Sequence, residues 1–401
     1  MYIEDELDRH DTEMALMSMH LQKAWGFRLV DKAPECEDVV VADPVLFFND
    51  YQFYGNYYHF TYDALLPLFR QLQLRGLILG DHSIPKGTLI LPAQQTAWRK
   101  SQDWSTEEFQ DSTRFHMNML TSLFPGQALV PVDARAASRM NGACFSNASF
   151  GTPFVWDDGT IDQSPAPFSS GPPIPMGRRE LLKAFADFVR ASLGLVPRKV
   201  KDGVVHIAVI SRKERRKISN EELLMEKLPR ILAVEHPQLS VVCELMDFNG
   251  MTYRDQVAKV GDIDVLVGMN GAGLINALYT NPDAVVVQLL PHGSNLNFDE
   301  FRSILRAVVP PSEESPVEHY SSRDHYMEWK NSIAENAVQP PNQYQPFDNE
   351  DTTVNEDEFF ELMRRAVTQI VATRSLRRQE MIGYAYGAAE MSVGIDGGEE
   401  E

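Results

Sequence analysis

Short apolar runs alternate with amphipathic stretches over the second half of the chain, from residue 199 onward. Each run is rich in Val, Ile and Leu and is bounded by turn-forming residues, which is typical of strands buried on both faces of a parallel sheet. The expected strands are Val204–Ile210, Leu239–Leu245, Ile263–Val267 and Val285–Leu290, and the expected helices are Ser219–Leu228, Thr252–Val260 and Leu274–Tyr279. This β-α-β-α-β-α-β order predicts an α/β, Rossmann-like domain.

The first half of the chain contains an aromatic-rich helix, expected from Asn56 to Leu72. At helical spacing Asn56, His59 and Asp63 fall on one face, with Tyr62 nearby. Aromatic helices are usually core, but a His and an Asp within an apolar run are costly to bury unless they are paired or used. This face is therefore a candidate functional surface, with a purely structural core helix as the alternative.

The remaining pattern is more irregular. Strands are expected at Val39–Val41, Leu77–Leu79 and Thr88–Leu91, and helices from Ser105 to Leu123, from Gly177 to Gly194 and from Thr353 to Ser375. Residues 310–356 are expected to be loop-like, with an aromatic patch at Tyr326 and Trp329. The expected divisions are residues 1–195, a second Rossmann-like domain at 196–310, an extension at 311–380 that packs back on both, and a disordered acidic tail at 381–401.

Two features at the ends of predicted strands suit an anion. The turn from Asn270 through Gly271, Ala272 and Gly273 has little side-chain bulk and opens a helix, where exposed peptide N–H groups bind phosphates. Arg212 and Arg216 follow the strand that ends at residue 210, so they are expected at the same carboxyl edge of the sheet. The alternatives are a turn that only allows close helix packing and a solvated basic loop.

Composition narrows the classes of partner. The chain has 401 residues and a formal net charge of −20, which argues against nucleic acid or an anionic membrane but not against a nucleotide-sugar held by a few arginines. Cys36, Cys144 and Cys243 match no metal-ligand spacing, so no metal is expected. Asn147 begins a glycosylation sequon, Asn-Ala-Ser, and neither a signal peptide nor a membrane-length apolar run is found, so a soluble chain is expected.

Three stretches together resemble glycosyltransferase family 61 over roughly residues 53–291. They are Gly55–His59 with Asp63 and Pro67–Phe69, then Ser211–Arg212 with Arg216, Ile218 and Asn220–Glu221, and finally Gly268–Pro291. A further stretch, 326–331 followed by 335–336, is similar to the branch that adds N-acetylglucosamine to protein O-linked mannose in the endoplasmic reticulum.

The resemblance implies a GT-B fold, in which two Rossmann-like domains face each other across a cleft. It also implies inverting transfer from a UDP-sugar to a glycoprotein acceptor in the endoplasmic reticulum or Golgi lumen, with no cofactor and no required metal. A homodimer is compatible with the sequence.

In this interpretation His59 or Asp63 is the base, and Asn56 and Tyr62 lie on the acceptor side. The donor-binding candidates are Arg212, Arg216, Asn220, Asn270, Gly271, Ala272, Gly273 and Gln288.

Two positions depart from the family pattern. Asn270 stands where the family usually has His, and Gln288 where it usually has Glu. Both keep hydrogen bonding but cannot supply the same charge or proton transfer, which could cost roughly 2–4 kcal/mol of transition-state stabilisation. From this sequence we expect neither the membrane anchor nor the fibronectin-like module that is usual in that branch.

Two other functions are therefore weighed beside the transferase. A non-catalytic protein that binds glycan or nucleotide is the alternative hypothesis. A dinucleotide oxidoreductase is disfavoured, because the turn reads GxxGAG rather than GxGxxG.

Overall fold

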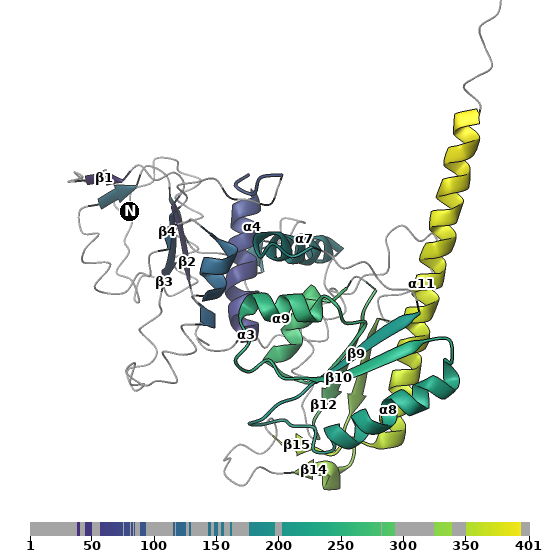
Figure 1. Cartoon of the computed structure of the whole chain (residues 1–401). Coiled ribbons are helices and arrows are strands. Elements are labelled where there is room, and N and C mark those ends of the chain that lie inside the picture. The colour runs from purple at the N-terminus through teal and green to yellow at the C-terminus, as the bar shows by residue number, and fades with distance from the viewer. Residues whose placement is uncertain are drawn as a thin grey trace, which may run out of the picture.

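A computed structural model provides the three-dimensional structure, an α/β arrangement of parallel sheets with packed helices (Figure 1). It describes residues 38–40, 45–49, 57–74, 76–80, 82, 84, 89–93, 115–116, 118–125, 128–129, 143–145, 148–150, 154–155, 161–162, 176–196, 203–281, 283–292, 325–338 and 350–393. Asn56 and Asn147 lie outside these residues.

The larger sheet has five strands, β9 Val204–Ile210, β10 Ser240–Met246, β11 Val265–Met269, β12 Val285–Leu290 and β13 Tyr326–Lys330. They run parallel in the order β10-β9-β11-β12-β13. The predicted alternation of strands and helices is confirmed. Two strands start later than expected, because the N–H groups of Leu239 and Ile263 bond the carbonyls of His236 and Val260 in the preceding turns.

The fifth strand corrects the expectation that residues 310–356 form a loop. Tyr326–Lys330 pairs with β12, so the predicted aromatic patch is an edge strand. Beyond it lie η4 Ala334–Asn336 and the two-stranded pair of β14 Ala337–Val338 with β15 Asp351–Thr352. A run of only five residues shows too little periodicity for a strand to be predicted from the sequence. Strand β13 forms because it can pair with β12.

Side chains alternate between the two faces of this sheet. In β9, Val205, Ile207 and Val209 join one cluster, while Ala208 and Ile210 join the other. The first cluster is completed by α8 Glu221–Glu235 and α11 Glu356–Val393, and the second by α9 Tyr253–Val260 and the 3₁₀ helix η2 Ala272–Tyr279.

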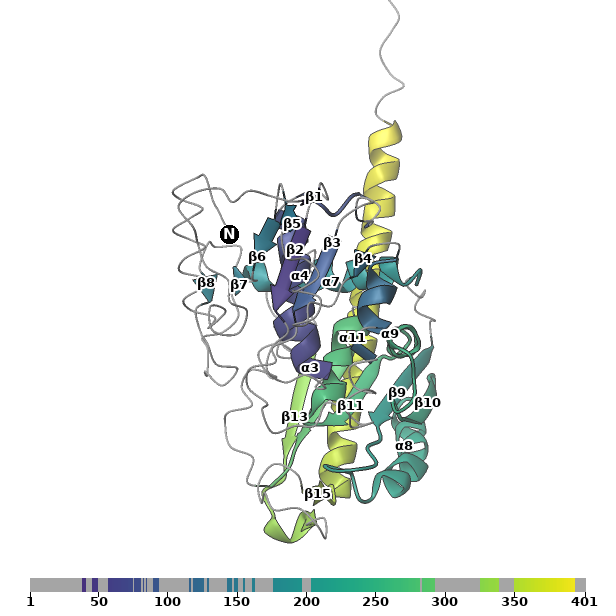
Figure 2. The same ribbon diagram turned by 90° about the vertical axis from the view of Figure 1, so that its left-hand side faces the viewer.

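Several helix boundaries differ from the sequence prediction, most clearly those of α8 and α11. Helix α8 begins at Glu221, two residues after the expected start, and the N–H of Ser219 bonds the carbonyl of Thr352 instead of lying in the helix. Its first residue follows Asn220, which makes no side-chain cap. Helix α11 continues well past Ser375, and Figure 2 shows its far end projecting beyond the sheet.

A smaller parallel sheet lies in the N-terminal part, in the order β4-β3-β2-β6. Its strands are β2 Val45–Asn49, β3 Leu89–Ala93, β4 Ala128–Leu129 and β6 Ala148–Phe150. Two further pairs are β1 Asp38–Val40 with β5 Ala143–Phe145, and β7 Phe154–Val155 with β8 Ile161–Asp162. The strand predicted at Leu77–Leu79 was wrong, because these residues form turns closed by bonds to Leu72 and from His82.

The predicted aromatic helix is present but not uniform. It consists of α3 Tyr57–His59, a π-helical turn η1 Phe60–Leu65, and α4 Leu66–Leu74. Pro67 has no N–H for the carbonyl four residues earlier, that of Asp63, and its ring crowds that carbonyl. Widening the helix just before the proline relieves this conflict, and such π-turns are frequent at functional sites.

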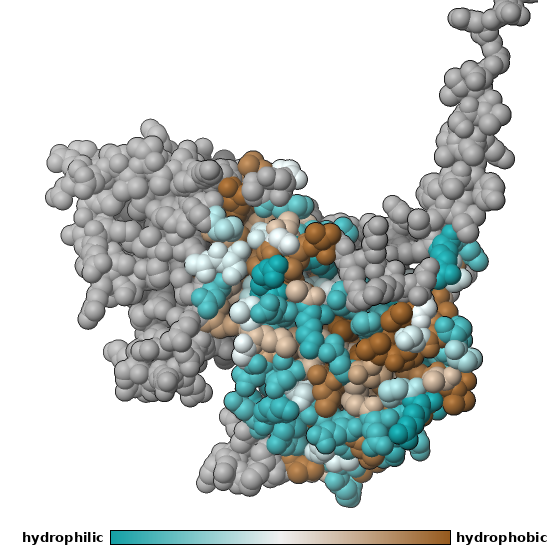
Figure 3. All heavy atoms as spheres, in the orientation of Figure 1, coloured by the Kyte–Doolittle hydropathy of each residue, from teal (hydrophilic) through white to brown (hydrophobic). Residues whose placement is uncertain are grey.

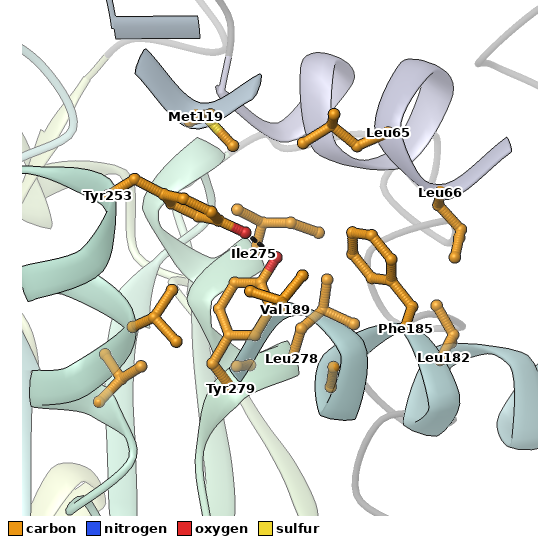
Figure 4. Packing of buried hydrophobic residues seen from close by; sticks show 14 of the residues in the cluster. Leu65, Leu66, Met119, Leu182, Phe185, Val189, Tyr253, Ile275, Leu278 and Tyr279 are labelled. Carbon is orange, nitrogen blue, oxygen red and sulfur yellow. Dashed lines mark hydrogen bonds between the residues drawn. The ribbon is translucent and has the colours of Figure 1, made fainter. Parts of the chain in front are cut away.

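The N-terminal helices share a hydrophobic core with the larger sheet. Figure 4 shows Leu65 and Leu66 near Phe185 of α7 Met176–Ser192, which packs against Ile275 and Leu278 of η2. The helix that carries His59 and Asp63 is thus joined through buried side chains to the helix that follows the glycine turn.

On the side of the molecule drawn in Figure 1, the surface around the larger sheet is mostly polar. Figure 3 shows hydrophilic residues over much of this face, with hydrophobic ones near the edge strand β10 and α8, where Val242 and Val234 are exposed. In the part of the chain that the structure describes, no helix combines the length and the apolarity that crossing a bilayer requires.

Candidate functional site

The strand order of the larger sheet marks one crevice as the natural ligand site. Within this sheet the first strand in sequence, β9, lies between the second, β10, and the third, β11, so the direction of the connections reverses between β9 and β11. Ligands of open parallel sheets bind at such a reversal, beyond the carboxyl ends of the two strands. Here β9 runs into Ser211 and Arg212, and β11 runs into Asn270 and Gly271.

The glycine turn, residues 270–273, connects β11 to η2. Gly271 occupies the cap position of η2 and offers no side chain to its first peptide N–H groups, which have no acceptor within the helix. A Cβ on Gly271 would overlap Nη1 of Arg212. The glycine is thus required by the approach of a guanidinium, and not only by packing of the helix on the sheet.

Two arginines converge on this turn from the arginine loop, residues 211–220. Nη1 of Arg216 donates to the backbone oxygen of Asn270 at 2.9 Å, and Nη1 of Arg212 donates to the same oxygen at 3.4 Å. Burial lowers the pKa of Arg212 from its ordinary value, and the positive charge of Arg215 lowers it further, while Glu214 and Asp351 oppose these effects. Arginine nevertheless stays protonated in proteins, so two positive charges meet at one neutral carbonyl.

The arginine loop is held at its far end by the segment 351–354. Ile218 forms a parallel bridge with Thr352, and Asp351 accepts a bond from the Lys217 N–H at 2.8 Å. Asn220 bonds Val354 through both amide atoms, donating from Nδ2 at 2.9 Å and accepting at Oδ1 at 3.0 Å. The side chain of Asn220, expected among the donor-binding residues, is therefore engaged in anchoring the loop.

Ser211 fixes the near end of the loop. Its hydroxyl donates to Oε1 of Glu221 at 2.6 Å and accepts from Nζ of Lys213 at 3.2 Å, while its N–H bonds the carbonyl of Met246 on β10. Between these two anchors Arg216 takes a left-handed backbone conformation, with φ of 53°. Such a conformation is costly for a residue other than glycine, and it persists only where the surroundings impose it.

The two positions that depart from the family pattern contact each other. Nε2 of Gln288 donates to Oδ1 of Asn270 at 3.0 Å, and both residues are 1% exposed. On the other side, the Tyr326 hydroxyl donates to Oε1 of Gln288 at 2.6 Å. Gln288 thus lies behind Asn270, and what it contributes to the site is the orientation of that side chain. The sequence placed Tyr326 in an aromatic patch and in a stretch that resembles one branch of the family, but nothing in it indicated a contact with Gln288, which Tyr326 makes because β13 pairs with β12.

The predicted base lies on the helix of the N-terminal part. Both His59 and Asp63 fall within the helix from Tyr57 to Leu74, although the structure describes only their backbone. Tyr62 is half-buried, and its ring stacks on that of Tyr58 at 5.8 Å.

A buried hydrogen bond, missed in the sequence, connects this helix to the glycine turn. The Tyr57 hydroxyl donates to Oδ1 of Asn276 at 2.8 Å, and Nδ2 of Asn276 donates to the carbonyl of Gly273 at 3.2 Å. Burial raises the pKa of Tyr57 well above its ordinary value, so its hydroxyl stays a donor. The start of the predicted catalytic helix is therefore tied to the turn beside the arginines.

Among the residues that the structure describes, no three His, Cys, Asp or Glu side chains gather closely enough to hold a metal ion. The expectation that no metal is needed stays a prediction.

The chain is similar in sequence to two kinds of curated transferase and, distantly, to one solved structure. It is 28% identical over 307 residues to the mouse protein O-linked-mannose beta-1,4-N-acetylglucosaminyltransferase 2, covering 76% of this chain but only 45% of that protein. It is also 29% identical over 112 residues to the chimpanzee EGF domain-specific O-linked N-acetylglucosamine transferase, covering 27% of this chain and 20% of that protein. The solved structure of E. coli heptosyltransferase WaaC with ADP superposes with a TM-score of 0.28 at 10% identity, covering 63% of this chain and 88% of that one, and is too distant to support an argument.

The chain thus spans about half the length of the curated relatives it matches most fully. The family model for Glycosyltransferase 61 matches residues 57–287, which is more than half of the chain and runs from the start of α3 to the middle of β12. The glycine turn and the arginine loop both lie inside this match, and the chain belongs to glycosyltransferase family 61.

Proposed function

We propose that the chain is an inverting glycosyltransferase that moves N-acetylglucosamine from UDP-N-acetylglucosamine to a hydroxyl group of a glycoprotein, such as O-linked mannose. The observation that carries this proposal is the convergence of Arg212 and Arg216 on the carbonyl of Asn270 at the reversal of strand order. Two guanidinium groups beside an uncapped helix start match the charge and the hydrogen-bonding geometry of a diphosphate.

The donor half of the reaction follows from this arrangement. As the bond between the anomeric carbon and the phosphate oxygen breaks, negative charge grows on the departing UDP. Arg212 and Arg216 would stabilise that charge, together with the peptide N–H groups of Gly271, Ala272 and Gly273. Fixed positive charge of this kind performs the task that a divalent cation performs in other transferases, and we propose that no metal is needed.

The acceptor half requires a base on the opposite side of the sugar. We assign it to His59 or Asp63, with Asn56 and Tyr62 on the acceptor side. The base takes the proton of the acceptor hydroxyl while that oxygen attacks the anomeric carbon in line with the departing phosphate, which inverts the configuration. The π-turn at Phe60–Leu65 and the bond from Tyr57 to Asn276 support this assignment, since they place a specialised helix against the donor turn.

The family relationship also suggests the wider setting. We propose a GT-B arrangement, in which the N-terminal sheet and the larger sheet face each other across a cleft that holds both substrates. The names of the relatives support a glycoprotein acceptor, and we propose that the chain acts in the endoplasmic reticulum or Golgi lumen. In such a compartment Asn147 would be an acceptor for glycosylation.

A second candidate function rests on the buried pair of Asn270 and Gln288. Neither side chain titrates, and each satisfies the other by a hydrogen bond. Such a pair would suit a family member that binds a nucleotide or glycan without catalysing transfer.

One experiment separates the two functions. UDP release is measured from UDP-N-acetylglucosamine and a mannosylated peptide, alongside calorimetry with UDP. The transferase predicts turnover that falls by on the order of 10²-fold in Arg212→Ala. The matched control is Arg364→Ala, which removes a guanidinium paired with Glu235, away from the arginine loop. Unchanged turnover in Arg212→Ala would contradict the diphosphate assignment, and UDP binding without transfer to any acceptor would favour the binding protein.

A further inference from the structure

The diphosphate site has a polar support that reaches it from the edge strand β13. The bond from Tyr326 to Gln288 and the bond from Gln288 to Asn270 form an unbroken chain on one face of the sheet. The register explains this placement, because Val286 pairs with Tyr326 and Gly268 pairs with Gln288. Tyr326 lies beyond the residues that the family model matches.

The direction of these bonds determines what Asn270 offers to a ligand. Oδ1 of Asn270 accepts the hydrogen bond from Gln288. The amide nitrogen Nδ2 of Asn270 donates to no residue that the structure describes, so it can donate to a ligand. If the Gln288 amide were reversed, its oxygen would face Asn270, Nδ2 would turn toward it, and Oδ1 would be left over instead. The first arrangement leaves a hydrogen-bond donor, and the second leaves an acceptor that repels phosphate oxygens.

Tyr326 selects between the two arrangements. A phenol carries one proton, and here the hydroxyl lies 2.6 Å from Oε1 of Gln288 but 3.3 Å from Oε2 of Glu328. The shorter contact directs the proton to Gln288, which holds the Gln288 oxygen toward β13 and its nitrogen toward Asn270. Without the hydroxyl, the buried Gln288 oxygen would lose this donor, and the reversed amide would become competitive.

We propose that Tyr326 is a positioning residue, which acts through Gln288 to keep the Asn270 amide nitrogen available as a third donor to the diphosphate held by Arg212 and Arg216. This inference rests on the proposed function for its ligand. The relay, meaning the two hydrogen bonds that connect Tyr326 through Gln288 to Asn270, is present in the folded chain without a ligand.

The test is a double-mutant cycle read out as the dissociation constant for UDP. Tyr326→Phe is expected to weaken UDP binding by about 5- to 10-fold, the loss of one hydrogen bond. In an Asn270→Ala background the same substitution is expected to change the dissociation constant less than about twofold, because the group it positions is gone.

Tyr253→Phe is the matched control. The Tyr253 hydroxyl is also buried and bonds that of Tyr279 at 2.8 Å, as Figure 4 shows, but it has no connection to Asn270. It is expected to lower Tm without changing the affinity for UDP. An equal loss of affinity in Tyr326→Phe and Tyr253→Phe, or an equal effect of Tyr326→Phe with and without Asn270, would overturn the proposal.

Failure of the ligand assignment is separable from failure of the relay. If the wild-type chain does not bind UDP, the proposed function is wrong, and the relay is then judged from thermal unfolding of the same variants. If Tyr326 acts through Gln288 on Asn270, the double variant Tyr326→Phe/Asn270→Ala should lose less Tm than the two single variants lose together. Additive losses would refute the relay.

Discussion

Gly271→Ala tests the donor site with the smallest possible change. The new methyl group would overlap Nη1 of Arg212, and the nearby carbon Cζ would lie 3.1 Å away. The overlapped atom is the end of a flexible side chain, so the guanidinium is expected to move aside while the turn persists. The substitution removes no charge, no hydrogen-bonding group and no buried apolar surface.

The size of the effect follows from what Arg212 loses. A hydrogen bond to a charged group contributes about 1.5–3 kcal/mol. Displacing one guanidinium from the diphosphate should therefore weaken UDP binding roughly 10- to 100-fold. Binding should not vanish, because Arg216 keeps its bond of 2.9 Å to Asn270 and does not meet the new methyl group.

Calorimetry with UDP and thermal unfolding of the same samples check this reasoning. Gly261→Ala is the control at the other end of β11, where the backbone is helical, with φ of −58°, and a methyl group would lie 3.4 Å from its nearest neighbours. Gly261→Ala is expected to keep Tm within a few degrees of the wild type, whereas Gly271→Ala should lower Tm more, because a side chain is strained at the φ of 159° that Gly271 adopts. If Gly271→Ala bound UDP as tightly as Gly261→Ala does, the guanidinium of Arg212 could not be a diphosphate ligand.

Two further predictions concern stability. Asp264→Asn breaks a buried ion pair with Arg374 of α11 and should lower the free energy of unfolding in urea by about 3–5 kcal/mol. The affinity for UDP should stay unchanged, because Asp264 precedes β11 at the end of the sheet opposite the site. Burial lowers the pKa of His116 from 6.5 to about 4, so the unfolded chain binds the extra proton over this range. Stability should therefore be fully present above pH 6.5 and fall by about 1.4 kcal/mol per unit toward pH 4, a dependence that His116→Gln should remove in denaturant titrations.

Sequence periodicity predicted the larger sheet well where apolar runs are continuous. The strands Val204–Ile210 and Val285–Leu290 have the predicted boundaries, since buried parallel strands must be apolar on both faces and their turns are marked by Gly, Pro and Asp. The strand at Tyr326–Lys330 escaped prediction, because it alternates over only five residues and forms against a strand that ends 36 positions earlier (326 − 290).

One part of the candidate site could also be predicted from the sequence, and another part could not. That the arginine loop and the glycine turn share one edge could be predicted, because all carboxyl ends of a parallel sheet lie together. The partners Tyr326, Asp351 and Asn276 could not be predicted, because each reaches the site through a tertiary contact that no local spacing encodes. In the sequence Asn270 and Gln288 are isolated departures from the family pattern, whereas in the structure they form one hydrogen-bonded pair.

The arginine loop is pre-organised for an anion at some expense of stability. Residues in the left-handed region such as Arg216 are strained by on the order of 1 kcal/mol, and two guanidinium groups sharing one carbonyl repel each other. Both costs are borne by the anchors on either side, Ser211 on Glu221 and Asn220 on Val354. A diphosphate would offset this repulsion, because its oxygens carry more negative charge than the carbonyl of Asn270. Ligand binding should then require little rearrangement, and loosening either anchor should weaken UDP binding.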